Sequence, residues 1–173
     1  MTASARGDLT GRAYVGMGSN LGDRAGHLLL ALRGMTRAGL CVPRFSSVYE
    51  TEPAGVLEEQ PAFLNMVAEL CAPLPPPPTL LRLLLDIEHA LGRRRERPLQ
   101  ARTLDLDLLL YGGETTATET LTLPHPRLHL RRFVLAPLTE LIPDSRHPTL
   151  GATFAELLAA TPDRPYVRLW APG

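Results

Sequence analysis

The chain has 173 residues, of which 45% are hydrophobic, so it is long enough for one domain with a substantial core. All 18 basic residues are arginines, which excludes any mechanism that needs a lysine, such as a Schiff base or the lysine of a P-loop. The formal net charge is zero, so the overall field does not steer the protein toward nucleic acid.

Compartment and chain organisation follow from what the sequence lacks. No stretch approaches the roughly 20 apolar residues of a membrane span, and residues 1–11 lack the apolar core of a signal peptide. We expect residues 1–11 to be a disordered tail and residues 12–173 to form a single domain. Cys41 and Cys71 fall in apolar stretches, which favours buried free thiols over a disulfide or a metal site. These features predict a cytoplasmic protein with no membrane or nucleic-acid partner.

Three segments before residue 72 have the composition and alternation of strands: residues 12–17, 40–49 and 63–70. Between the first two, Asp23 can cap a helix that runs to about Arg37. In the third strand Phe63 and Asn65 share one face, because side chains alternate along a strand. Residues 51–61 are rich in proline, glycine and acidic residues, so we expect a loop there.

The second half of the chain contains helices and one further long strand. We expect the prolines of residues 73–78 to form a stiff spacer within one domain, with a domain boundary at this spacer as the alternative. Apolar periodicity predicts helices over residues 79–91, with Thr79 as the cap, and from Arg131 or Arg132 to Leu141. A capping box at Thr153 predicts a short helix over 154–160. Residues 113–122 are rich in threonine, and we expect a small β excursion.

The long strand contains the segment Asp105-Leu106-Asp107, within a run over residues 102–111. Its alternation predicts a half-buried strand with both carboxylates on one face and their Cα atoms about 6.6 Å apart. Two carboxylates this close repel each other unless a cation lies between them, and such oxygen ligands suit Mg²⁺. A solvated sheet face has the same pattern, so the pair alone leaves both interpretations open.

Arginines precede this strand. Residues 93–102 contain five arginines and one glutamate, which gives a local charge of +4. Guanidinium groups bind phosphate oxygens well because their N–H donors form a planar fork. A basic run beside a carboxylate pair therefore favours a site for a nucleotide with Mg²⁺.

The order of these elements is β-α-β-β-α-β followed by helices. This order predicts an α+β fold of the ferredoxin-like type, in which helices pack on one face of an antiparallel sheet, with additional C-terminal helices.

Four motifs occur in order between residues 12 and 145. They are Gly18-Ser19-Asn20-Leu21-Gly22, then Ser46 to Pro53 with Gln60 to Asn65, then Arg102 to Asp107, and finally Pro124-His125 with Arg131-Arg132-Phe133. Together they resemble the 6-hydroxymethyl-7,8-dihydropterin pyrophosphokinase family of folate biosynthesis. The resemblance implies that residues 12–173 form a single pyrophosphokinase domain. The implied reaction transfers a pyrophosphoryl group from ATP to the hydroxymethyl group of the pterin and leaves AMP.

The resemblance also implies roles for individual residues. Asp105 and Asp107 would hold two Mg²⁺ ions. The residues implied for the pterin are Phe63 and Phe133, which would stack on it, and Thr51, Glu52, Pro53, Ala54 and Asn65, which would bind its edge. The residues implied for ATP are Glu88, Arg93, Arg95, Arg102, His125 and Arg131, of which Arg93 and Arg102 are also implied in catalysis. From the residues alone, Glu88 can be merely solvated and His125 can be a surface turn residue.

The chain departs from the family where Leu99-Gln100-Ala101 stands in place of a Trp-Gly-Pro. The missing tryptophan would help to close a loop over the pterin. We expect the loop of residues 93–101 to be mobile without ligands and to become ordered over ATP, because it has almost no apolar residue to bury.

Two other functions remain open. One is a different Mg²⁺-dependent nucleotidyltransferase or phosphotransferase on a ferredoxin-like sheet, and the other is a ligand-binding module without catalysis. The product formed from ATP distinguishes them, since a pyrophosphokinase releases AMP. The expected partners are the small molecules ATP and hydroxymethyldihydropterin, and we expect a monomer.

Overall fold

The computed structural model describes residues 8–53, 59–92, 101–162 and 165–172. In chain order the elements are β1 (Arg12–Ser19), α1 (Arg24–Arg37), β2 (Cys41–Phe45), β3 (Tyr49–Thr51), β4 (Phe63–Cys71), α2 (Pro77–Ala90), β5 (Asp105–Tyr111), β6 (Thr116–Ala117), β7 (Thr122–Leu123), the 3-10 turn η1 (Leu128–Leu130), α3 (Arg132–Leu141), α4 (Phe154–Ala160) and β8 (Val167–Leu169). In this part of the chain no helix is both long and apolar enough to cross a membrane.

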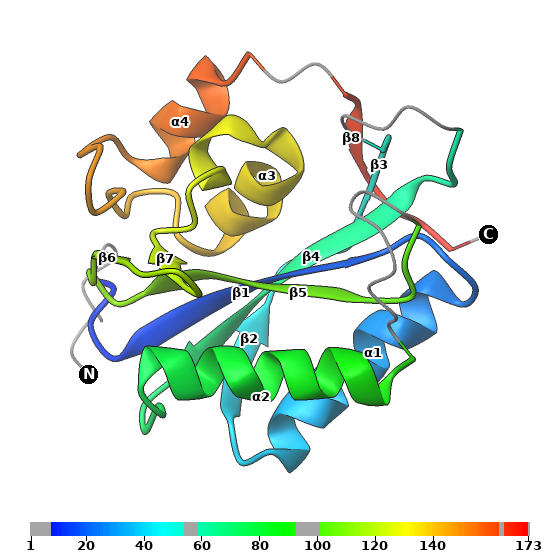
Figure 1. The fold of residues 1–173 in the computed structure, drawn as a ribbon. Coiled ribbons are helices and arrows are strands. Elements are labelled where there is room, and N and C mark those ends of the chain that lie inside the picture. The colour runs from blue at the N-terminus through cyan, green and yellow to red at the C-terminus, as the bar shows by residue number, and fades with distance from the viewer. Residues whose placement is uncertain (1–7, 54–58, 93–100, 163–164, 173) are drawn as a thin grey trace.

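An antiparallel sheet forms the centre of the molecule. Its strands follow the order β5-β1-β4-β3-β8, and β2 also pairs with β4. Helices α1 and α2 lie on one face of this sheet, whereas α3 and α4 lie on the other (Figure 1). The structure therefore confirms an α+β fold with helices packed on an antiparallel sheet. It differs from the expectation in that helices cover both faces.

Alternation along the strands creates two cores. Met17, Leu64 and Leu106 point to the face covered by α1 and α2 and pack there with buried leucines of these helices. Tyr14 and Val67 point to the opposite face and belong to the core beneath α3 and α4. Side chains of successive strand residues point to opposite faces, so one set of strands supplies both cores.

Helix ends follow local chemistry. Asp23 caps α1 by accepting a hydrogen bond from the N–H of Gly26, and Thr153 forms the expected capping box with Glu156. The prediction that Thr79 caps α2 is wrong, because the helix begins at Pro77 and has no side-chain cap. Proline suits the first helical position, where its missing N–H is not needed. Part of the expected spacer is therefore helix.

Two strand predictions need correction. The strand expected over residues 40–49 is two strands, because Ser46 lies between them and its hydroxyl accepts a hydrogen bond from the N–H of Val67. Strand β8, which pairs with β3, is a further difference, because no strand was expected there. This strand has only three residues, so it carries almost no periodic signal.

The start of the fold lies earlier than expected. Leu9 is buried, and the N–H of Ala72 donates to the carbonyl of Gly11. The expected tail over residues 1–11 therefore does not include residues 8–11, and residues 1–7 lie outside the described part of the chain.

The two cysteines are also placed differently from the prediction. Cys41 is exposed and Cys71 is half-buried, so the prediction of two buried thiols is wrong. Both are free thiols, but they stand directly opposite each other on β2 and β4. The apolar residues around them in the sequence point elsewhere, since neighbouring strand residues face opposite sides.

A buried carboxylate stabilises the sheet end that lies away from the carboxylate pair. Glu69 accepts hydrogen bonds from Tyr14 Oη at 2.9 Å and from Arg44 Nη2 at 2.6 Å, and it also pairs with Arg12. Burial alone would raise the pKa of Glu69, but the Arg44 and Tyr14 hydrogen bonds and the two guanidinium charges outweigh it and lower the pKa.

Glu69→Gln should lower the free energy of unfolding at pH 7 by about 1–3 kcal/mol. The substitution removes a buried carboxylate that accepts hydrogen bonds from Tyr14, Arg44 and Arg12. The carboxylate contributes this stability above its reference pKa of 4.5, and the contribution is lost as the pH falls through the lower folded pKa. The difference between the two proteins should therefore shrink below pH 4.5 in urea unfolding from pH 8 to 3. A difference that stays constant over this range would contradict the assignment.

Candidate active site

Strand β1 lies between the strand that carries Asn65 and the strand that carries Asp105 and Asp107. On one side of β1, Asn65 of β4 pairs with Gly18, and on the other side Asp105 of β5 pairs with the same glycine. One step along the strand, Gly16 pairs with Asp107. Directly paired residues point to the same face, so the asparagine and both carboxylates share the face that α3 covers.

Gly18 lies in close contact with its neighbour. A Cβ atom at this position would come within 2.9 Å of Asn65 Oδ1 and within 3.7 Å of Phe63 Cδ1. The sheet therefore has no side chain between the amide on β4 and the carboxylate on β5. The Asn65 amide takes the space that a Cβ of Gly18 would need, so Asn65, Gly18 and Asp105 form a row across β4, β1 and β5 with a glycine at its centre.

The carboxylate pair is electrostatically strained. Burial, and then the charge of Asp105, raise the pKa of Asp107 to about 7, while the guanidinium of Arg131 opposes this rise. A cation between the two carboxylates would relieve the repulsion. In the described ranges no three His, Cys, Asp or Glu side chains are grouped as a metal site, so these residues would supply two carboxylates, and oxygens of solvent or substrate could complete the shell. Mg²⁺ accepts this arrangement, since it commonly binds one or two carboxylates plus substrate phosphates.

Arg102 connects the two halves of the row. Its Nη1 lies 3.1 Å from Asp105 Oδ2, and its guanidinium carbon lies 5.7 Å from the centre of the Phe63 ring. Its Nε is buried and has no hydrogen-bond partner among the described residues. An unsatisfied buried donor is costly, so this N–H is suited to bind an oxygen of a ligand.

Glu88 lies in a buried position that the sequence did not indicate. Its side chain is buried on α2, and its Oε1 accepts a hydrogen bond of 2.6 Å from the N–H of Leu106. This N–H lies between Asp105 and Asp107 on β5. The interpretation of Glu88 as merely solvated is therefore wrong, because the residue fixes the strand that carries the carboxylate pair.

Asn65 is held in one orientation on its strand. Its Nδ2 donates to Thr51 Oγ1 at 2.7 Å, and both side chains are buried. Phe63 lies one step along β4 on the same face and pairs with Thr51 across the strands. Glu52 and Pro53 follow β3 directly, whereas Ala54 lies outside the described residues.

Residues after β5 also act on the carboxylate pair, since the charge of Arg131 opposes the rise in the pKa of Asp107. Arg131 is half-buried, and its guanidinium carbon lies 5.5 Å from the centre of the Phe133 ring. His125 is half-buried as well, and burial, followed by the charges of Arg131 and Arg127, lowers its pKa to about 4. The imidazole is therefore neutral at pH 7. Arg93, Arg95 and the expected mobile loop, apart from Ala101, lie outside the described part of the chain.

Asn20 was expected only as a member of the motif Gly18-Ser19-Asn20-Leu21-Gly22, with no role of its own. Its side chain is buried, and its Oδ1 accepts a hydrogen bond of 2.7 Å from the N–H of Arg102. Its Nδ2 donates to Gln60 Oε1 and to the carbonyl of Pro61, each at 3.2 Å. Asn20 therefore joins the end of β1 to the segments that lead into β4 and β5.

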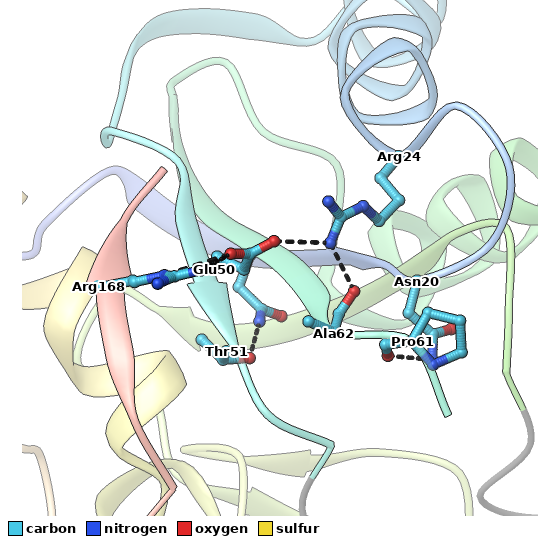
Figure 2. A network of polar contacts seen from close by, with 8 residues as sticks. Asn20, Arg24, Glu50, Thr51, Pro61, Ala62 and Arg168 are labelled. Carbon is cyan, nitrogen blue, oxygen red and sulfur yellow. Dashed lines mark hydrogen bonds and ion pairs between the residues drawn. The ribbon is translucent and has the colours of Figure 1, made fainter. Parts of the chain in front are cut away.

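A second set of contacts holds the same region (Figure 2). Arg24 Nη1 donates to Glu50 Oε1 at 3.1 Å and to the carbonyl of Ala62 at 2.7 Å. The other oxygen of Glu50 accepts from Arg168 on β8 at 2.5 Å. The opposing charges lower the pKa of Glu50, first through the Arg168 hydrogen bond. These contacts link α1, β3 and β8 to the residue that precedes Phe63.

Comparison with known proteins agrees with this arrangement. Residues 14–143 match the model of the family described as 7,8-dihydro-6-hydroxymethylpterin-pyrophosphokinase (HPPK). The chain belongs to the HPPK family. This span includes β1, β4 and β5, and thus all of the candidate residues that the structure describes.

Relatives of similar length bear the corresponding names. A 2-amino-4-hydroxy-6-hydroxymethyldihydropteridine pyrophosphokinase of Bacillus subtilis is 42% identical over 159 residues, which cover 91% of this chain and 89% of the relative. One of Haemophilus influenzae is 37% identical and is covered over 97% of its length.

HPPK relatives also occur within larger proteins. The folic acid synthesis protein of Pneumocystis carinii is 39% identical over 142 residues, but this chain spans only 19% of it. Among solved structures, an HPPK-DHPS in complex with substrates superposes with a TM-score of 0.68 at 13% identity, covering 86% of this chain and 43% of the other. At this identity the superposition supports the fold alone.

Proposed function

We propose that this chain transfers the pyrophosphoryl group of ATP to the hydroxymethyl group of 6-hydroxymethyl-7,8-dihydropterin, which gives AMP and the pterin diphosphate. The observation that carries the proposal is the row of Asn65, Gly18 and Asp105, in which a fixed amide on β4 and a carboxylate pair on β5 flank the glycines of β1. Membership of the HPPK family and a pyrophosphokinase relative that matches 91% of the chain support the same reaction.

The pterin would bind on the β4 side of the row. A flat heterocycle needs aromatic walls and a few fixed polar groups. We propose that Phe63 and Phe133 are the walls, and that the edge of the ring bonds to Thr51, Asn65 and the backbone of Glu52, Pro53 and Ala54. The hydrogen bond between Asn65 and Thr51 supports this assignment because it fixes the amide before the ligand arrives.

The phosphates of ATP would bind on the β5 side. We propose that Asp105 and Asp107 hold two Mg²⁺ ions, which would neutralise phosphate charge and stabilise the attacking and leaving oxygens. The arginines proposed to contact the phosphates are Arg93, Arg95, Arg102 and Arg131, with Arg93 and Arg102 acting in catalysis. Neutral His125 and Glu88 are the proposed contacts of the nucleotide. Phosphoryl transfer needs positioning and charge neutralisation more than covalent chemistry, and these groups supply both.

Three finer features of the fold and assembly belong to the same proposal. We propose that residues 12–173 form one pyrophosphokinase domain and that the protein acts as a monomer. We also propose that the sheet is a ferredoxin-like variant, because β1 lies between β4 and β5 and the additional β8 extends the edge beyond β3.

One assay distinguishes this function from its alternatives. The protein is incubated with ATP, Mg²⁺ and hydroxymethyldihydropterin, and the nucleotide products are separated. We expect AMP to form in equal amount to the pterin diphosphate. Release of free pyrophosphate with a nucleotidylated product would indicate a nucleotidyltransferase, and ATP binding without any turnover would indicate a binding module.

Phe63→Ala should weaken pterin binding by about 0.5–1.5 kcal/mol from lost stacking, in addition to lost apolar burial, and should leave ATP binding nearly unchanged. The reason is its position beside Asn65, on the β4 side of the row. Titration of each ligand separately, with a melting curve for each protein, measures both effects.

Phe45 offers a matched control, since it is an aromatic residue on β2 that is 54% exposed. Phe45→Ala should change neither affinity. Equal losses of pterin and ATP affinity in Phe63→Ala, or general unfolding, would mean that Phe63 is a core residue and that the pterin binds elsewhere.

A further inference from the structure

The two cysteines of the chain form a close pair far from the row of Asn65, Gly18 and Asp105. Cys41 begins β2 and Cys71 ends β4, and their Cα atoms are direct partners in the antiparallel ladder. Opposite residues in such a ladder have Cα atoms about 4.5–5.5 Å apart, within the range that a disulfide spans. The two Sγ atoms lie 2.9 Å apart. A bond of about 2.05 Å therefore needs only a small movement of the sulfurs.

The surroundings of the pair favour reaction over burial. Cys41 is exposed to solvent, and Cys71, its partner in the ladder, is half-buried. The thiol of Cys71 donates to the sulfur of Cys41, and this hydrogen bond is the first cause that raises the pKa of Cys71. Cys41 is the more accessible of the two sulfurs, so a small disulfide in solution meets it first.

The pair is less suited to hold a metal. Two thiolates alone do not complete the four-ligand shell of a structural zinc site. Over the described residues, no group of three His, Cys, Asp or Glu side chains is placed to hold an ion. The neighbouring charged groups are Arg12 and Glu69, which already pair with each other.

We propose that Cys41 and Cys71 form a redox-active dithiol site, which low-molecular-weight disulfides oxidise to a reversible cross-strand disulfide. The Cys41 thiol gives its proton to water, and the resulting thiolate attacks one sulfur of the small disulfide, forms a mixed disulfide and releases one thiolate. The Cys71 thiol then loses its proton to this released thiolate and attacks the Cys41 sulfur, and the second small thiolate leaves and takes a proton from water. In total, two protein thiols are oxidised, and one small disulfide is reduced to two thiols.

The disulfide would close a loop that contains most of the residues proposed to bind the pterin, from Thr51 to Asn65. The two cysteines are 30 positions apart, and β2, β3 and the residues from Thr51 to Asn65 lie between them. A cross-link of this kind restricts the unfolded chain and so stabilises the folded state. Its bond lies at the opposite end of β4 from Phe63, so we expect oxidation to stabilise the protein without changing turnover.

The test compares the full chain after incubation with oxidised glutathione and after incubation with dithiothreitol. Intact mass under non-reducing conditions, free-thiol titration and thermal melting are measured on both samples. We expect the oxidised monomer to lose two hydrogens and both free thiols, and to melt about 10 °C higher, an increase that dithiothreitol reverses.

Variants make the result specific. Cys41→Ser and Cys71→Ser should each fail to form the internal bond and show no increase in melting temperature, and Cys41→Ser should also be slower to take up glutathione. The double variant should melt like the reduced protein in both samples. Stable glutathione adducts on wild type without internal bond formation, covalent dimers as the main product, or an unchanged melting temperature in the oxidised monomer would each overturn the proposal.

Discussion

Asp107→Ala should reduce pyrophosphoryl transfer by roughly 100-fold or more at ordinary Mg²⁺ concentration, because even groups that only support metal ligands typically contribute 10- to 100-fold. The fold should remain intact, since Asp107 faces away from the leucine core that α1 and α2 cover. The measurement is turnover against Mg²⁺ concentration, beside a melting curve of the metal-free protein.

Two further variants sharpen this prediction. Asp107→Asn should recover little activity, because the missing quantity is negative charge as well as an oxygen atom. Without metal it should melt no lower than wild type, since burial and the neighbouring Asp105 disfavour the charge that it removes. Asp86, an exposed carboxylate on α2, provides the control, and Asp86→Ala should be fully active. Near wild-type turnover in Asp107→Ala would refute the metal assignment.

Asn20→Ala should lower turnover by roughly 10- to 100-fold, because its side chain holds two segments that border the candidate site. The side chain fixes the backbone of Arg102 on one side and of Pro61 on the other, so its loss should displace phosphate and pterin contacts together. It should also destabilise the fold by about 1 kcal/mol, because the half-buried N–H of Arg102 loses its acceptor.

Separate affinities for the two substrates distinguish a positioning role from a loss of stability. Asn20→Asp keeps an acceptor for Arg102 but cannot donate to Gln60 and Pro61, so it should weaken pterin binding more than ATP binding. Leu21→Ala, at the exposed neighbouring position, should leave both unchanged. If Asn20→Ala melts lower but its folded fraction has normal turnover and affinities, the residue is structural only.

Much of the fold was predictable because its signals are local. The cap at Asp23, the capping box at Thr153 and the common face of Phe63 and Asn65 each depend on residues within four positions of one another, and the structure confirms all three. Thr79 was misjudged because the adjacent prolines satisfy the helix start equally well.

The assembly of the site was not predictable from such signals. Nothing in the periodicity of β4 and β5 indicates that β1 lies between them, since pairing register depends on contacts distant in sequence. Asn20 escaped notice for the same reason, because its partners Pro61 and Arg102 are 41 and 82 positions away. The proximity of Cys41 and Cys71 was not expected either, since they are 30 positions apart and both lie in apolar sequence. Before the structure, only the resemblance to a family indicated that the four motifs form one site.

The row from Asn65 through Gly18 to Asp105 has a length that the spacing of the strands fixes. Its length is two steps between neighbouring strands, or about 9.6 Å, since strands lie 4.7–4.9 Å apart. This length is set by backbone hydrogen bonds rather than by the size of any side chain. Substitutions among the leucines of the core beneath α1 and α2 should therefore leave the distance between Asn65 and Asp105 unchanged, provided that the strand pairing is kept. Stability and substrate spacing can then vary independently in this fold.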